Sequence, residues 1–237
     1  MTIQAVLFDL DDTLFDYSHA SQQAIRLVHS QLAAPSPDLT HFAERHHHYL
    51  EQVHAEFIVG RFCLNDARVE RFRRLFAELG QSLSFDEAQD IGDRYRAEFM
   101  RNRRAMAGAR QLLLTLQAHA RIAIVSNNAH QEQINKLRHI GLDDCIDALV
   151  TSESAGIAKP AAGIFLKTLD ELGCRPDQAV MVGDNWDADI EGALAAGLRA
   201  VWLNRHGLAA PAQSEVPQLL SLEDTHAICR LLLSRND

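Results

Sequence analysis

Five short apolar runs constrain the fold of this chain more than any other feature of its sequence. Each run is rich in β-branched or aliphatic residues and lacks alternating polar positions, which is typical of strands that are covered on both faces. From about residue 105 onward, segments with helical spacing separate the runs. Strands that alternate with helices predict a parallel sheet with right-handed crossovers, an open doubly wound α/β layer. The runs are 5–8, 122–125, 148–150, 179–182 and 200–203.

The long gap between the first and second runs indicates an insertion. Residues 17–100 show no convincing strand pattern, but they contain apolar residues at helical spacing, such as Ala24 and Val28 on one helical face. The sequence therefore predicts an all-helical domain at 17–100. It would be inserted into a core that is formed by 1–16 and 101–237.

Composition and charge exclude several classes of protein. The 237 residues are 47% hydrophobic, which is enough for the core of a soluble globular protein, and the formal net charge is −9. That charge argues against nucleic-acid polymers and membranes as partners, because it repels polyanions. No apolar run approaches the roughly 20 residues of a membrane helix, and the start of the chain lacks the features of a signal peptide. The four cysteines are widely scattered, which favours reduced thiols in a cytoplasmic protein.

Polar residues follow several of the apolar runs, at the point where each predicted strand ends. In open parallel sheets, ligands bind outside the carboxyl ends of the strands, so these residues are candidates for a functional site. Asp9 and Asp11 follow the first run, and Ser126 follows the second. Asp184 follows the fourth run, and Lys159 opens a helical segment after the third. We expect these side chains to converge in one crevice.

The acidic residues in this group predict a metal site. Asp9, Asp11, Asp184 and Asp189 would crowd several carboxylates into one place, which is untenable without a cation. Hard oxygen ligands suit Mg²⁺ better than zinc, for which the sequence offers no nearby histidine or cysteine cluster.

The remaining polar residues predict phosphoryl chemistry. Ser126 supplies a hydroxyl, Asn127 an amide and a main-chain N–H, and Lys159 a positive charge, all of which are phosphate-binding groups. A carboxylate such as Asp9 can take a phosphoryl group from a monoester and form an aspartyl phosphate. Asp11 can protonate the departing oxygen and later take a proton from water, provided that adjacent negative charge raises its pKa.

In their order along the chain, these segments resemble the haloacid dehalogenase superfamily. Its phosphatases carry an Asp-x-Asp-x-Thr motif after the first strand, Ser or Thr after the second, Lys before a helix, and an acidic motif after the fourth strand. The matching segments are Asp9-Leu10-Asp11-Asp12-Thr13, Ser126, Lys159-Pro160 and 183–193. The resemblance covers the chain from Ala5 to Leu203. It implies a Rossmann-like core with a mobile helical cap inserted after the first motif.

The resemblance also implies roles for individual residues. Mg²⁺ would be held by the Asp9 carboxylate, the Asp11 main-chain carbonyl and Asp184, with Asp189 in support. Asp11 indicates a phosphatase, because the true dehalogenases of the superfamily have a different residue at its position. The implied catalytic residues are Asp9, Asp11 and Lys159, and the implied substrate-binding residues are Leu10, Thr13, Ser126, Asn127 and Lys159.

Some conspicuous residues receive a structural interpretation instead. The run His46-His47-His48 cannot converge on one ion, because consecutive residues of a helix point in different directions, so a solvated surface is expected. Arg71, Arg73 and Arg74 are interpreted as a solvated face, with substrate contact by one of them as the alternative. Asp187 is left out of the metal shell as a candidate helix cap.

Three hypotheses for function remain open from the sequence. The leading one is a phosphomonoesterase of small phosphorylated metabolites, with a nucleoside monophosphate or a sugar phosphate as substrate. The alternatives are a sugar phosphomutase with the same intermediate and a non-catalytic module that binds phosphometabolites. A weaker resemblance indicates the branch of pyrimidine 5′-nucleotidases and N-acylneuraminate phosphatases. It lies in Gly60 followed by Arg71-Phe72, and in Trp202-Leu203-Asn204-Arg205. A monomer or homodimer is expected.

Overall fold

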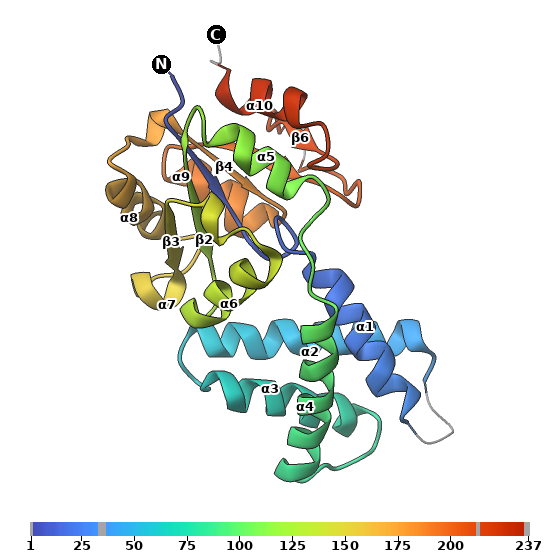
Figure 1. Cartoon of the computed structure of the whole chain (residues 1–237). Coiled ribbons are helices and arrows are strands. Elements are labelled where there is room, and N and C mark those ends of the chain that lie inside the picture. The colour runs from blue at the N-terminus through green and yellow to red at the C-terminus, as the bar shows by residue number, and fades with distance from the viewer. Residues whose placement is uncertain (1, 33–36, 212–213, 235–237) are drawn as a thin grey trace. The chain divides into compact units, whose positions relative to one another are not determined.

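The computed structural model describes residues 2–32, 37–211 and 214–234, which form two compact units (Figure 1). One unit, the core unit, comprises Met1–Asp16 and Arg104–Asp237, and the other, the helical unit, comprises Tyr17–Arg103. The sequence predicts that the insertion ends at residue 100, whereas the helical unit extends to Arg103.

The core unit contains the predicted parallel sheet. Its six strands are all parallel and lie in the order β3-β2-β1-β4-β5-β6. The α/β class predicted from the apolar runs is confirmed, whereas the short edge strand β6 was not predicted, because it has no apolar run. The strands are β1 (Ala5–Phe8), β2 (Arg121–Ser126), β3 (Ala148–Thr151), β4 (Ala179–Gly183), β5 (Arg199–Leu203) and β6 (Gln218–Leu219).

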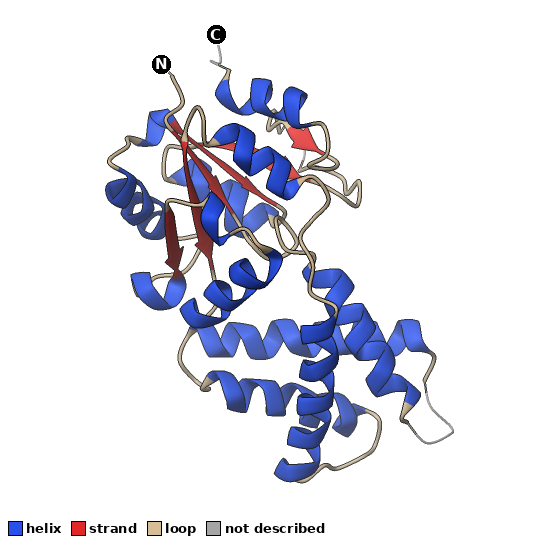
Figure 2. Ribbon diagram, in the orientation of Figure 1, coloured by secondary structure: helices blue, strands red, loops and turns tan. Residues whose placement is uncertain are grey.

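Helices cover both faces of this sheet (Figure 2). All four residues of β1 are fully buried, as expected for a central strand covered on both sides. Leu7, Val125 and Met181 join the apolar cluster that includes α8 and α9. The helices of this unit are α5 (Ala109–Leu116), α6 (His130–Ile140), α7 (Ser152–Ala155), α8 (Ala162–Leu172), α9 (Gly192–Ala195) and α10 (Thr225–Leu233), with short turns η1 (Asp143–Cys145), η2 (Pro176–Gln178) and the π-helical η3 (Trp186–Glu191).

The register of the sheet brings the polar strand ends to one edge. Phe8 of β1 pairs with Ile124 of β2 on one side and with Val182 of β4 on the other. The carboxyl ends of the three central strands are therefore nearly level, and the residues that follow them meet at the same edge.

The helical unit consists of α1 (Tyr17–Ser30), α2 (Leu39–Ile58), α3 (Leu64–Glu78) and α4 (Phe85–Arg101). Helix α1 packs on α4, and α2 packs on α3. Ser84 and Glu87 form a capping box that begins α4, which satisfies main-chain N–H groups at that end. No helix among the described residues is long and apolar enough to cross a bilayer.

Gly108 provides a test of the packing in the core unit. It precedes α5 at φ 82°, and a Cβ at this position would overlap the main chain of Leu222 and Glu223. We expect Gly108→Ala to lower the free energy of unfolding by about 2–4 kcal/mol, from left-handed strain plus overpacking. Urea denaturation followed by tryptophan fluorescence measures this loss in the core unit, which holds both tryptophans.

Gly207 is the matched control for this substitution. Its φ is 63°, but nothing lies within 4 Å of the Cβ that alanine would add. Gly207→Ala should therefore cost only the left-handed strain, about 1–2 kcal/mol. Equal losses in the two variants would contradict the close approach of Leu222 to Gly108.

Candidate active site

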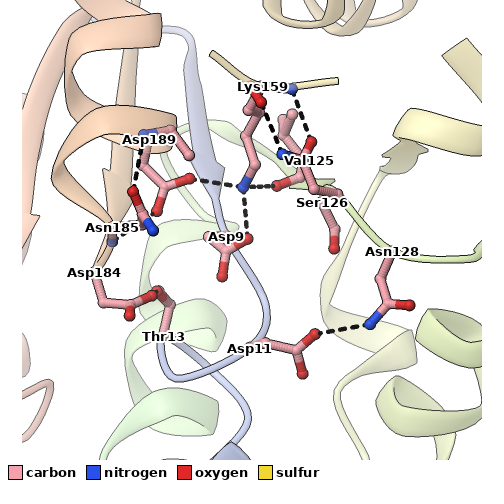
Figure 3. Close-up of polar contacts among 12 residues, drawn as sticks. Asp9, Asp11, Thr13, Val125, Ser126, Asn128, Lys159, Asp184, Asn185 and Asp189 are labelled. Atoms are coloured by element: carbon pink, nitrogen blue, oxygen red, sulfur yellow. Dashed lines mark hydrogen bonds and ion pairs between the residues drawn. The ribbon is translucent and has the colours of Figure 1, made fainter. Parts of the chain in front are cut away.

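The side chain of Lys159 lies at the centre of the candidate site (Figure 3). Its Nζ donates hydrogen bonds to Asp9 Oδ1 at 2.6 Å, to Asp189 Oδ1 at 2.7 Å and to the main-chain carbonyl of Val125 at 2.7 Å. Burial alone would lower the pKa of Lys159, but the charges of Asp189 and Asp9 raise it above its ordinary value. The amine is therefore a fixed positive charge with all three N–H groups engaged.

The main chain of Lys159 is held by Asn127, which follows β2. Asn127 Nδ2 donates to the Lys159 carbonyl at 2.8 Å, and the Lys159 N–H donates to Asn127 Oδ1 at 2.7 Å. The side-chain amide that was expected to bind phosphate thus positions Lys159 in this structure.

Three carboxylates lie close enough to share one cation. A ligand oxygen from each of Asp9, Asp184 and Asp189 lies within 4.8 Å of the others. Burial, opposed by the charge of Lys159, raises the pKa of Asp9 to about 7. Burial and the charges of Asp9 and Asp189 raise the pKa of Asp184 to about 8. These all-oxygen donors fit a hard divalent cation, whose charge would keep the carboxylates ionised at neutral pH.

Asp189 contributes to this cluster mainly by holding its neighbours. Its Oδ1 accepts from Lys159, and its Oδ2 accepts from the main-chain N–H of Asn185 at 3.1 Å. Asn185 also caps η3 by accepting from Ala188 N at 2.9 Å. The helix-cap role considered for Asp187 therefore belongs to Asn185, and Asp187 is exposed.

The loop that follows β1 is a tight turn that carries two of the predicted residues. The Leu10 carbonyl accepts from the N–H groups of Leu14 and Phe15 at 3.0 and 2.8 Å, and the Leu10 side chain is fully buried. Asp12 adopts φ 60° in this turn. Thr13 is also buried and donates from Oγ1 to Asp184 Oδ1 at 3.0 Å. Thr13 thereby links this loop to the acidic segment after β4.

The environment of Asp11 differs from the one expected. Lys136 Nζ lies 2.5 and 2.7 Å from the two Asp11 carboxylate oxygens, and Gln133 donates to Oδ2 at 3.0 Å. Burial would raise the pKa of Asp11, but Lys136, with help from Gln133 and Asn128, holds it below its usual value. The expectation that adjacent negative charge raises this pKa is therefore wrong for this arrangement.

Lys136 and Gln133 are site residues that the sequence analysis missed. Both lie on α6 and are buried, and Gln133 Nε2 also donates to Ser126 Oγ at 2.5 Å. Their spacing of three residues places them on one face of the helix that follows β2. Two polar residues at that spacing, on the helical segment that follows a predicted site strand, were the signal available in the sequence.

Trp202 supports the acidic segment from the neighbouring strand β5. It is 3% exposed, and its Nε1 donates to the Asp184 main-chain carbonyl at 2.8 Å. Its ring meets the Trp186 ring edge-on, with the centroids 5.1 Å apart. The indole therefore fixes the main chain on which Asp184 stands.

A family comparison agrees with this geometry. The family model described as haloacid dehalogenase-like hydrolase matches residues 3–197, which includes Asp9, Lys159 and Asp184. The chain belongs to the haloacid dehalogenase-like hydrolase family. The resemblance inferred from the motifs is thus confirmed, and the protein is an enzyme of this family.

Three named proteins are similar to between 43% and 92% of this chain. A ribulose-1,5-bisphosphate 5-phosphatase of Halopiger xanaduensis is 34% identical over 200 residues, covering 83% of this chain and 83% of that protein. The N-acylneuraminate-9-phosphatase of Homo sapiens is 27% identical over 229 residues, covering 92% and 89%. The pyrimidine 5′-nucleotidase YjjG of Escherichia coli is 41% identical over 103 residues, covering 43% and 45%.

A solved structure of another haloacid dehalogenase-like hydrolase has the same fold. The magnesium-bound YfnB of Bacillus subtilis superposes with a TM-score of 0.78 at 23% identity, covering 97% of this chain and 99% of that one. At this level of identity the similarity establishes the fold.

Gly183, at the end of β4, tests whether the position of Asp189 matters to this hydrolase. A Cβ on Gly183 would overlap the Asp189 carboxylate. We expect Gly183→Ala to displace that carboxylate and, through it, Lys159. Activity should fall by about a hundredfold, the scale of a 1 Å misplacement at a reacting centre.

Gly163→Ala is the control for this change. Its added Cβ meets at 3.0 Å only Cδ1 of Ile157, the far end of a flexible side chain, so the neighbour can move. Steady-state assays of the two folded variants make the comparison. Activity of Gly183→Ala near that of Gly163→Ala would rule out this role for Asp189.

Proposed function

We propose that the protein is a Mg²⁺-dependent phosphatase of small phosphorylated metabolites that works through an aspartyl phosphate on Asp9. The observation that carries the proposal is the buried Asp9 carboxylate at the end of β1, paired with Lys159 and close to Asp184. The names of three relatives, two phosphatases and a nucleotidase, support the reaction class.

In the first step, a carboxylate oxygen of Asp9 attacks the phosphorus of the monoester. An O–P bond forms to Asp9, and the bond from phosphorus to the ester oxygen breaks. The Lys159 ammonium lies 2.6 Å from Asp9 and offsets negative charge on the phosphoryl oxygens. Asp11 then gives its proton to the departing alkoxide, which leaves as an alcohol.

In the second step, water attacks the phosphorus of the aspartyl phosphate and Asp11 takes its proton. Inorganic phosphate is released and the Asp9 carboxylate is restored. The arrangement described above suits this step, because Lys136 holds Asp11 in the ionised form that a general base needs. For the first step, Asp11 must carry a proton, so its contact with Lys136 has to loosen when the substrate binds.

We propose that the Asp9 and Asp184 carboxylates and the Asp11 main-chain carbonyl hold the Mg²⁺, with Asp189 behind them. The Asp11 carboxylate is not part of the acidic cluster and is bound to Lys136 instead. When bound, the cation would neutralise charge on the carboxylates and on the transferred phosphoryl group. The magnesium in YfnB supports this choice of metal.

Chemistry that the relatives share supports a substrate class. Their names specify a sugar bisphosphate, an acylneuraminate phosphate and a pyrimidine nucleotide, all of them small phosphate esters. We propose a sugar phosphate or a nucleoside monophosphate as substrate and the role of a cap domain for the helical unit. A cytoplasmic location and a monomeric or homodimeric state remain predictions. Phosphate release from a panel of metabolites with Mg²⁺ tests the substrate class, and no turnover of any monoester would contradict it.

Asp9→Asn tests the nucleophile. An amide cannot take the phosphoryl group, so turnover should fall by at least about a thousandfold, while the circular dichroism spectrum is retained. Asp187→Asn is the matched control, because Asp187 is an exposed carboxylate in the nearby acidic segment, and it should keep near-normal activity. Activity of Asp9→Asn close to the control would remove Asp9 from this role.

The stabilising effect of Mg²⁺ should increase with pH. The pKa of Asp9 is raised from 3.8 to about 7 and that of Asp184 to about 8, and both must ionise to bind a cation. A carboxyl group whose pKa is higher in the folded state than in the unfolded state stabilises the metal-free protein at pH values below its unfolded-state pKa. This stability is lost as the pH rises through its folded-state pKa. The metal-free protein should therefore lose this stability between about pH 4 and about pH 8. Mg²⁺ should therefore raise Tm more at about pH 8.5 than at about pH 5.

Thermal denaturation with and without Mg²⁺ at the two pH values measures this difference. Asp184→Asn, which removes one of the carboxylates, should reduce the Mg²⁺ effect at both. An equal gain in Tm at the two pH values in the unsubstituted protein would contradict the proposed ligands.

A further inference from the structure

Arg71 of α3 is buried, contrary to the solvated face expected from the sequence. Its residue surface is 7% exposed, whereas Arg73 is exposed and Arg74 is partly buried on the same helix. Arg73 pairs with Glu70, and Arg74 pairs with Glu70 and with Glu56. Among the described residues, none forms a hydrogen bond or ion pair with Arg71, and its Nε is fully buried without a partner.

Two aromatic rings pack against the Arg71 guanidinium. Its Cζ lies 4.8 Å from the centroid of the Phe72 ring and 4.4 Å from that of Tyr95. The imidazole of His46 packs on the same two rings, with centroids 5.6 and 5.0 Å away. Ring contacts favour the cation but do not satisfy its five N–H donors.

His46 is a second buried polar group in this cluster. It is 2% exposed, and its Nε2 has no hydrogen-bond partner. The expectation of a solvated surface is therefore wrong for His46, although His47 and His48 are exposed. Burial and the charge of Arg71 hold the pKa of His46 well below its usual range, so its ring is neutral and carries one N–H donor.

The absence of a counter-charge distinguishes Arg71 from the other buried cations. Among the described residues, Lys136, Lys159 and Arg71 are the buried lysines and arginines. Lys136 is paired with Asp11, and Lys159 is paired with two carboxylates. A buried Nε without a hydrogen-bond partner, on a buried arginine without a counter-charge, is costly, which favours an anionic ligand that completes the cluster.

We propose that Arg71 and His46 form a binding site for a small oxyanion, a carboxylate or phosphate group, within the helical unit. The planar fork of the guanidinium matches two oxygens of such a group, and a neutral imidazole can donate a further hydrogen bond. A metal ion is disfavoured here by the charge of Arg71. The oxyanion is either free in solution or carried by a larger metabolite, and the same contacts serve both.

The direct test is an NMR titration of the full-length protein labelled with ¹⁵N-arginine. Sodium phosphate and sodium acetate are added at constant ionic strength, with sodium chloride as the reference, and the Arg71 Nε–Hε signal is assigned by its loss in Arg71→Lys. We expect a saturable shift at Arg71 and no comparable shift at Arg73. No saturable shift at Arg71, or the same shift at Arg73, would overturn the proposal.

Arg71→Lys also tests the geometry, because it keeps the charge but removes the fork. When phosphate binding is followed through the NMR signals of His46, Arg71→Lys should show an affinity about tenfold weaker, because one charge-assisted hydrogen bond is lost. Arg73→Lys should leave the affinity unchanged. Unchanged affinity in Arg71→Lys would contradict bidentate binding by Arg71.

Kinetics separate the two sources of the oxyanion. If the substrate carries it, Arg71→Lys raises KM for a monoester with a second anionic group and not for an aryl monophosphate. If it is free, KM for both is unchanged while the NMR shift persists. The NMR titration requires no turnover, so a failure of the proposed phosphatase function would leave this inference standing.

Discussion

The rest of the site depends on the hydrogen bonds and ion pairs that the buried Lys159 ammonium group makes. It joins a carboxylate after β1, a carbonyl within β2 and a carboxylate in η3. A buried lysine is tolerated only when each of its N–H groups has a hydrogen-bond partner, so Lys159 requires all three of these partners. The neighbouring features serve this arrangement: Asn127 fixes the Lys159 main chain, and Gly183 leaves space for Asp189.

The carboxylates that Lys159 holds together also determine the chemistry of the site. Asp9 shares its environment with a cation and with two other carboxylates, so its ionisation depends on what the site binds. A preorganised positive charge beside a carboxylate nucleophile is the kind of arrangement that stabilises a transferred phosphoryl group. Structural stability and proposed catalysis therefore rest on one network.

The sheet and the convergence of its polar strand ends could be predicted, because both follow from local patterns. Strands covered on two faces have continuous apolar runs, and level parallel strands bring Asp9, Ser126 and Asp184 to one edge. The pairing of Asp11 with Lys136, and hence the direction of its pKa shift, depends on how α6 lies against the strand ends. The burial of Arg71 likewise depends on packing between helices, which charge patterns along α3 do not reveal.

We propose that Asp9 carries the phosphoryl group during turnover. The most direct measurement is acid quenching of the enzyme during the pre-steady-state phase with a monoester substrate, followed by mass spectrometry of the peptide that contains Asp9. We expect a phosphorylated Asp9 that forms with the first product and decays as inorganic phosphate appears. Product formation without any phosphorylated peptide, or with the phosphoryl group on another residue, would contradict it.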